Sequence, residues 1–145
     1  ISCPTESIHL QGRFDTWPKR RGVTRVAELD RAGINVCFAQ DSIQDPWYPL
    51  GNGNIMRILD AGLHICHMLG YEDLQRCLDL ITDNSARALC LGDNYGIVEG
   101  RPANLLILDA ENDYDAVCRQ AKVLTSVRHG NVIMQRQPEE ICYPV

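Results

Sequence analysis

Residues 34–47 contain the feature that most constrains the fold, a short apolar run that ends in a carboxylate. Residues 34–39 (INVCFA) are rich in β-formers, and Asp41 follows them before a polar loop closes with DPW at 45–47. Enzymes built on α/β barrels present catalytic groups in this way, from the C-terminal tip of a strand. A buried strand whose Asp caps the next turn has the same pattern. Taken alone, the segment allows both interpretations.

Composition indicates a globular protein and argues against a nucleic-acid surface. The 145 residues can bury one ordinary core, and 45% apolar with 23% charged residues is typical of soluble folded domains. The net charge of −5 disfavours a surface that follows phosphates, and we expect the basic run Lys19-Arg20-Arg21 to be a solvated loop. No apolar run approaches the roughly 20 residues that span a bilayer, and no signal peptide opens the sequence. We therefore expect a cytoplasmic protein with neither nucleic acid nor membrane as a partner.

The seven cysteines predict reduced thiols rather than a disulfide framework. Most of them fall within apolar patterns, as the free thiols of a cytoplasmic protein do. No C-x-x-C pair occurs, which excludes thioredoxin-like proteins, zinc ribbons and the small zinc nucleoside deaminases. The sequence starts at Ile1 without a methionine, so a removed leader, a truncation and a proteolytic fragment are all open.

Periodicity and capping residues predict several helices in the first 92 residues. The clearest helix has apolar residues at three- and four-residue spacing, with Asn54 as its cap and Gly70 as its end. Upstream of it we expect a long functional loop dense in His, Arg, Asp and Trp, a helix capped by Thr24 and ended by Gly33, and a strand. The loop is expected at residues 1–23, the helix at 24–31 and the strand at 34–39. The two later short helices are expected at 71–81 and 84–91.

His64 and His67 lie three residues apart on the clearest helix and therefore share a face. Two such histidines can bind a metal ion, but we expect no acid or cysteine beside them at ligand spacing. We expect a surface or partly packed pair.

From residue 93 onward short strands dominate the pattern. His129-Gly130 is a plausible two-residue hairpin turn between two of them. A unit of around 50 residues is too small to fold alone. The elements expected are a strand and turn at 96–100, a buried strand at 104–109, a short helix at 114–120, and strands at 123–128 and 131–135.

Six segments of the sequence resemble a known family. The segments NSARAL, YGIVEGRPANLLILD and SVRHGNVI, at 84–89, 95–109 and 126–133, look like the C-terminal signature of the amidohydrolase superfamily. More specifically, the segments IHLQGRFDT, PKRRG and DPWYPLG, at 8–16, 18–22 and 45–51, resemble the bacterial cytosine deaminases, a metal-dependent barrel family. The resemblance covers almost the whole chain and fades after residue 134.

The resemblance implies the α/β fold class and a place in the last third of a longer enzyme. Residues 1–92 would form the last β/α units of a TIM-like (β/α)8 barrel, in which residues 34–41 are strand eight and residues 54–70 the closing helix. Residues 93–145 would form part of a small β-sandwich.

The resemblance also implies a site at the barrel mouth with one divalent metal ion, iron or zinc. Asp41 would be a metal ligand and also the catalytic group that passes a proton from water to the departing amine. The remaining ligands of the family include a His-x-His pair, which this sequence lacks. Gln40, Ser42 and Trp47 would contact the substrate, a small heterocyclic base.

The residues beside Asp41 depart from the family pattern. Relatives tend to carry His-Asp-Asp there, with the second acid facing the bound base, whereas this sequence has Gln40-Asp41-Ser42. The short, neutral Ser42 puts cytosine in doubt and leaves other amino-substituted pyrimidines, purines or triazines open. We expect deamination by the full enzyme, no activity of the isolated chain, and homo-oligomerisation or self-association. The alternative is a non-catalytic interaction or assembly module derived from an amidohydrolase.

Overall fold

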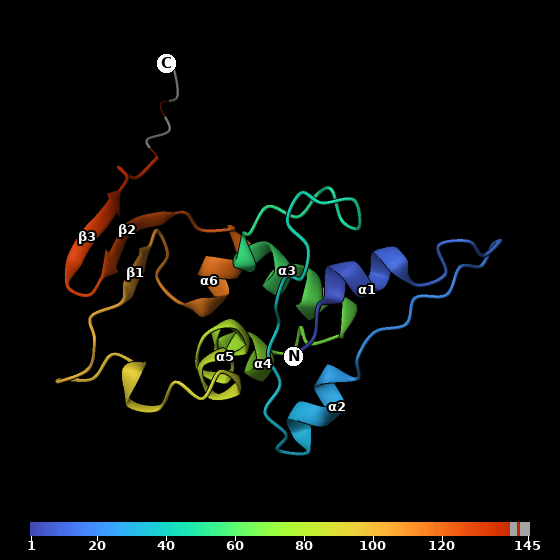
Figure 1. Cartoon of the computed structure of the whole chain (residues 1–145), viewed down its shortest axis with the longest axis horizontal. Coiled ribbons are helices and arrows are strands. Elements are labelled where there is room, and N and C mark those ends of the chain that lie inside the picture. The colour runs from blue at the N-terminus through green and yellow to red at the C-terminus, as the bar shows by residue number, and fades with distance from the viewer. Residues whose placement is uncertain (140–141, 143–145) are drawn as a thin grey trace. The chain divides into compact units, whose positions relative to one another are not determined.

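The structure, a computed structural model, describes residues 1–139 and residue 142. The chain divides into two compact units, Ile1–Leu91 and Gly92–Val145. Figure 1 shows short helices in the first unit and the strands β1 to β3 in the second. This mixture of helix and strand agrees with the predicted α/β class, whereas the (β/α)8 barrel and the β-sandwich remain predictions.

The first unit consists mainly of short helices joined by long loops. The expectation of an irregular loop over residues 1–23 is wrong at its start, because Pro4 suits the first helical turn, where its fixed φ angle and missing N–H carry no penalty. No helix in the described part of the chain is long and apolar enough to cross a membrane. The helices of this unit are α1 (Pro4–Leu10), α2 (Val26–Arg31), α3 (Ile55–Ile65), α4 (Tyr71–Gln75), the 3-10 helix η1 (Cys77–Ile81) and α5 (Asp83–Ala88).

The predicted strand over residues 34–39 is a segment with a single bridged residue. Ser2 bridges Phe38 in parallel orientation: the Ser2 N–H donates to the Cys37 carbonyl at 2.9 Å, and the Ala39 N–H donates to the Ser2 carbonyl at 2.9 Å. The pairing extends no further because α1 begins just after Ser2 and takes the chain into a helix. The prediction of a full strand is therefore wrong, although a parallel partner is present.

On its other edge, segment 34–39 forms hydrogen bonds with residues of two helices, η1 and α5. The Phe38 N–H donates to the Leu80 carbonyl at 2.9 Å, and the buried Asn84 donates from Nδ2 to the Val36 carbonyl at 2.8 Å. Asn35 in turn donates from Nδ2 to the Asn84 carbonyl at 3.0 Å. Buried backbone groups need such partners, and here η1 and α5 supply what a neighbouring strand would.

Helix α3 starts as predicted and ends early. Asn54 caps it, since its side chain accepts a hydrogen bond at 3.1 Å from a backbone N–H of the first turn. The helix ends at Ile65 rather than near Gly70, because His67 takes the left-handed conformation (φ 55°) that usually falls to Gly after a last turn.

The core of the first unit lies between α3 and segment 34–39. The Phe38 ring packs directly on Gly62 of α3, where an added Cβ atom would come within 2.7 Å of the ring. Helix α3 also packs against α1 and η1. The largest fully buried side chains are those of Phe38, Ile58, Leu59, Leu63, Val26, Pro4 and Cys77.

The helices predicted over residues 71–81 and 84–91 are shorter than expected. Arg76 leaves the helical conformation (φ −128°) and separates α4 from η1, while its guanidinium pairs with Asp30 of α2. Helix α5 ends at Ala88 because Cys90 is left-handed, with φ 54°. The breaks therefore fall at residues whose side chains give no local stop signal.

The second unit is a three-stranded antiparallel sheet with the order β1-β2-β3. His129 (φ 48°) and Gly130 (φ 78°) are both left-handed, as a two-residue type I′ hairpin turn requires. The predicted late helix and the predicted hairpin are confirmed. The described elements are η2 (Gly92–Asn94), β1 (Leu105–Leu108), α6 (Asp113–Cys118), β2 (Val123–Arg128) and β3 (Asn131–Gln135).

Two predictions for this unit are wrong. Residues 96–100 contain the predicted turn, at 99–100, but no strand, since Gly96 (φ 111°) and Gly100 (φ 86°) adopt backbone conformations that break a ladder. Strand β1 is not buried, because it pairs with β2 at one edge of the sheet and the side chains of Leu106 and Ile107 are 63% and 53% exposed.

Replacing Gly62 with Ala is expected to destabilise the protein. The methyl group would lie 2.7 Å from the Phe38 ring, and overpacking of this kind costs about 1–3 kcal/mol. Ala gains about 1 kcal/mol over Gly inside a helix, so we expect a net loss of about 1 kcal/mol in the free energy of unfolding. Denaturant unfolding measures it. The methyl group should cost less in a Phe38→Leu background, and a Gly62→Ala variant of raised stability would contradict the contact.

Candidate active site

Asp41 lies directly after segment 34–39 and presents an exposed carboxylate. Among the described residues its carboxylate has no hydrogen-bond or ion-pair partner, unlike those of Asp15, Asp30 and Asp45. A free carboxylate at the end of a restrained segment can accept a proton or ligate a metal ion. The structure thus places the predicted catalytic residue where its side chain is available for chemistry.

Gln40 is held by the loop that follows Asp41. Its Oε1 accepts a hydrogen bond from the Gly53 N–H at 2.9 Å. Gly51 lies against it, and a Cβ atom at Gly51 would come within 2.7 Å of the Gln40 Nε2 and within 1.9 Å of the Ser42 carbonyl oxygen. Only glycine allows this approach, so residues 40–42 and the far end of the loop form one packed unit.

Ser42 is buried, with 5% of its surface exposed. Its side chain lies near the Asp45 carboxylate, which accepts the N–H groups of Tyr48 at 2.9 Å and Trp47 at 3.0 Å. The Tyr48 N–H, the Ser42 hydroxyl and the Trp47 N–H together hold the pKa of Asp45 below its usual value. The predicted contact of Ser42 with the substrate remains a prediction.

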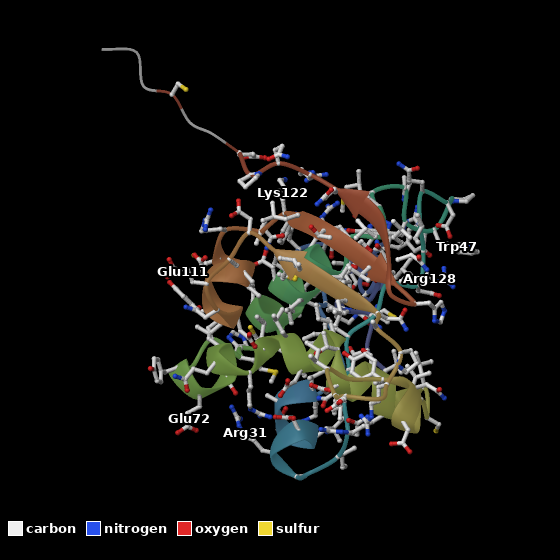
Figure 2. All side chains as sticks on the ribbon, turned by 90° about the vertical axis from the view of Figure 1, so that its left-hand side faces the viewer. Arg31, Trp47, Glu72, Glu111, Lys122 and Arg128 are labelled. Atoms are coloured by element: carbon white, nitrogen blue, oxygen red, sulfur yellow. The ribbon has the colours of Figure 1, made fainter. Side chains whose placement is uncertain are left out.

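Trp47 projects from the loop and is 66% exposed (Figure 2). The Asp45 turn fixes its backbone, and the Gln44 N–H donates to the Gly51 carbonyl at 2.9 Å, which closes the loop at its base. The Tyr48 ring lies 5.6 Å from the His9 ring of α1. Residues 44–51 therefore form a braced loop that presents the indole on the outside.

Glu6 was not predicted from the sequence and lies close to these residues. Its carboxylate is buried, with 5% of the residue exposed, and its Oε1 accepts the Ser42 N–H at 3.5 Å. Burial raises the pKa of the nearby Cys3 thiol, and the negative charges of Glu6 and Asp41 raise it further. The carboxylates of Glu6 and Asp41 therefore both raise the pKa of the same thiol. No local pattern reveals this, because Glu6 and Ser42 are 36 residues apart.

The described residues contain no group of three or more His, Cys, Asp and Glu side chains that could hold a metal ion. His64 and His67 are both exposed, as expected for a surface pair. Asp60, overlooked in the sequence, lies one turn before His64, with its Oδ1 3.3 Å from the His64 Nδ1. A histidine whose Nδ1 faces Asp60 and a neighbour with a left-handed backbone do not form a metal site.

The loop after α1 is fixed by its own basic residues. Lys19 donates from Nζ to three carbonyls, those of Gly12 at 3.4 Å, Arg13 at 3.1 Å and Asp15 at 3.0 Å. Arg20 donates from Nε and Nη2 to the two carboxylate oxygens of Asp15, at 2.6 and 2.8 Å. These bonds give a shape to a loop that Figure 1 shows extending away from α1.

The sequence profile of the amidohydrolase family matches residues 1–134. The chain belongs to the amidohydrolase family. A 5-methylcytosine deaminase from Klebsiella pneumoniae has 88% sequence identity to it, and its crystal structure with 5-fluorocytosine matches 99% of this chain and 35% of its own with a TM-score of 0.96. For the same enzyme with phosphonocytosine the TM-score is 0.95.

Two other relatives are more distant. The N-isopropylammelide isopropyl amidohydrolase of Pseudomonas sp. (strain ADP) is 34% identical over 110 residues, which are 76% of this chain and 27% of that protein. The pterin deaminase of Rhizobium rhizogenes (strain K84 / ATCC BAA-868) is 27% identical over 140 residues, 96% of this chain and 32% of that protein. This chain therefore spans between 27% and 35% of the length of these relatives. The predicted resemblance to the C-terminal portion of a bacterial cytosine deaminase is confirmed.

Replacing Arg20 with Met is expected to raise the pKa of Asp15 from about 2 toward its usual 3.8, because the Arg20 hydrogen bonds are the main cause of the lowering. In the unchanged protein the stability that this pair gives the loop is present above pH 3.8 and is lost as the pH falls toward 2. Carbon-detected NMR titration of the Asp15 carboxyl measures the pKa. The control is Arg21→Met, since Arg21 donates to a backbone carbonyl. An Asp15 pKa that stays near 2 in Arg20→Met would contradict the pairing.

Proposed function

We propose that this chain is the C-terminal third of an amidohydrolase that deaminates cytosine or a related amino-substituted base and releases ammonia. The observation that carries the proposal is 88% identity, over 99% of this chain, to an enzyme named for 5-methylcytosine. The crystal structures of that enzyme hold 5-fluorocytosine and phosphonocytosine, both cytosine derivatives. The free Asp41 carboxylate is the group of this chain that suits the chemistry.

The reaction exchanges the amine on C4 of the base for oxygen. The oxygen of a water molecule adds to C4, the C–N bond breaks, and the amine leaves as ammonia with the proton that the water loses. A carboxylate close to both atoms can carry this proton, and such general acid–base catalysis contributes typically about 10²–10⁴-fold to a rate. In this proposal Asp41 is the carrier, since its side chain is exposed and forms no hydrogen bond or ion pair with another described residue.

Asp41 also fits one coordination position of a divalent metal ion, which amidohydrolases generally use. Hard cations prefer carboxylate oxygens that are free of other partners, and those of Asp41 are free among the described residues. Because no described group of three or more ligand side chains exists, the proposal places the other ligands in the part of the enzyme outside this chain. When bound, the ion would lower the pKa of the attacking water.

The replacement beside Asp41 supports a pocket with room for a substituent at C5 of the base. Ser42, which is short and neutral, stands in place of the second acid of the family pattern. A base with a substituent at C5, as in the name of the 88% identical enzyme, is therefore proposed alongside cytosine. The exposed indole of Trp47 would stack on the base, and the Gln40 Nε2 would donate to it, because its Oε1 is already engaged.

Replacing Asp41 with Asn in the whole enzyme is expected to lower kcat by about 10³-fold or more, because the amide cannot carry the proton. Ammonia release from 5-methylcytosine and from cytosine measures kcat. The melting temperature should stay unchanged, because Asp41 forms no hydrogen bond or ion pair among the described residues. Asp93→Asn, at a 97% exposed carboxylate in the second unit, is the matched control. Unchanged turnover in Asp41→Asn would show that this acid takes no part in the reaction.

The 145 residues expressed alone are expected to release no ammonia and to bind metal ions weakly, because one free carboxylate does not form a metal site. Self-association is expected as well, since large apolar side chains such as Ile34 and Leu50 are more than half exposed. Ammonia assays, metal analysis and sedimentation test these points. Turnover by the isolated chain comparable to that of the whole enzyme would favour a different site.

A further inference from the structure

Glu6 is a buried carboxylate whose role the proposed reaction leaves open. It lies in the first turn of α1 and is 5% exposed. The Thr5 hydroxyl donates to its Oε2 at 2.7 Å, and the Ser42 N–H donates to its Oε1 at 3.5 Å. Burying a carboxylate is costly unless donors compensate it, so a Glu in this place calls for an explanation.

The burial of Glu6 excludes direct contact with the substrate. The atoms of this chain alone cover 95% of the residue, and any further part of a longer enzyme can only cover more of it. A base that binds at the exposed Asp41 carboxylate therefore does not reach Glu6. An effect of Glu6 on the reaction has to pass through the residues that it touches.

The residue that links Glu6 to the site is Ser42. Its N–H belongs to the peptide plane that joins it to Asp41, so an acceptor for this N–H restrains the ψ angle of Asp41 and with it the direction of the Asp41 side chain. Gly51 lies against the Ser42 carbonyl, which belongs to the next peptide. The N–H contact with Glu6 is therefore the restraint that acts on the Asp41–Ser42 peptide itself.

We infer that Glu6 is a positioning residue for the deamination: its Oε1 fixes the Asp41–Ser42 peptide and so aims the Asp41 carboxylate at the substrate. The inference rests on the proposed function, in which Asp41 carries the proton. A carboxylate suits this task because a charged acceptor binds an N–H more strongly than a neutral one, most of all where water is excluded.

Two replacements in the whole enzyme separate the acceptor from the bulk of the side chain. Glu6→Gln keeps an Oε1 that accepts the Ser42 N–H, whereas Glu6→Leu has a similar volume and no acceptor. Misplacing a catalytic group by about 1 Å can cost about 100-fold, so we expect kcat of Glu6→Leu to fall by about 30- to 100-fold and kcat of Glu6→Gln by about threefold at most. KM should change little in either, because Glu6 does not touch the base.

Controls distinguish positioning from general stability. Thr5→Val removes the other donor to Glu6 and leaves the Ser42 contact, so its kcat should stay near that of the unchanged enzyme. The melting temperature of each variant is measured in parallel. If Glu6→Leu does not fold, Glu6→Asp takes its place, since it keeps the charge and withdraws the acceptor by one methylene. Undiminished kcat in the variant that lacks the acceptor, or an equal loss in Glu6→Gln, overturns the inference.

Hydrogen exchange at the Ser42 amide tests the inference apart from activity. Loss of the acceptor is expected to speed exchange of this amide by about tenfold, while the Gln variant keeps its protection. Normal protection in Glu6→Leu overturns the inference even if the enzyme is a deaminase. A whole enzyme that deaminates no base, yet shows the expected exchange pattern, refutes the proposed function and retains Glu6 as the residue that orients this peptide.

Discussion

Segment 34–39, which precedes Asp41, is held in place by hydrogen bonds on both edges. Its partners are Ser2 on one edge and Leu80 and Asn84 on the other. A lone extended segment has no stability of its own in water, and here one bridge and two helix contacts take the place of a ladder. Phe38 adds a ring that packs on Gly62 of α3. The position of Asp41, and of the loop that carries Trp47, follows from these restraints.

Features that depend on a few neighbouring residues could be predicted from the sequence. The Asn54 cap and the His129-Gly130 turn are examples, because each is decided by the conformational preferences of one or two side chains. Helix ends were predicted less well. His67 and Cys90 take the left-handed positions expected of Gly. At each of these helix ends a closing hydrogen bond forms, from the Met68 N–H to the Leu63 carbonyl and from the Leu91 N–H to the Ala86 carbonyl.

At the candidate site, a contact between residues far apart in the sequence could not be predicted. The sequence has Ser42 beside Asp41 in place of a second acid, so a negative charge is expected to be missing there. The structure brings a carboxylate to the same residue from a helix 36 positions earlier in the chain. Neither apolar periodicity nor a motif could show this contact, because it depends on how α1 meets the Asp41 loop. Strand 34–39 was overpredicted for a related reason, since a ladder needs a partner of matching length.

The three consecutive basic residues at 19–21 have a consequence for how this protein meets anions. Each of them donates to the loop itself, Lys19 to three carbonyls, Arg20 to a carboxylate and Arg21 to the Arg20 carbonyl. A phosphate or an acidic peptide attracted to this triplet would compete with these bonds for part of the donors. Some of the hydrogen-bonding capacity that stands out in the sequence is thus used by the loop, and a count of basic residues overstates what the surface offers to a polyanion.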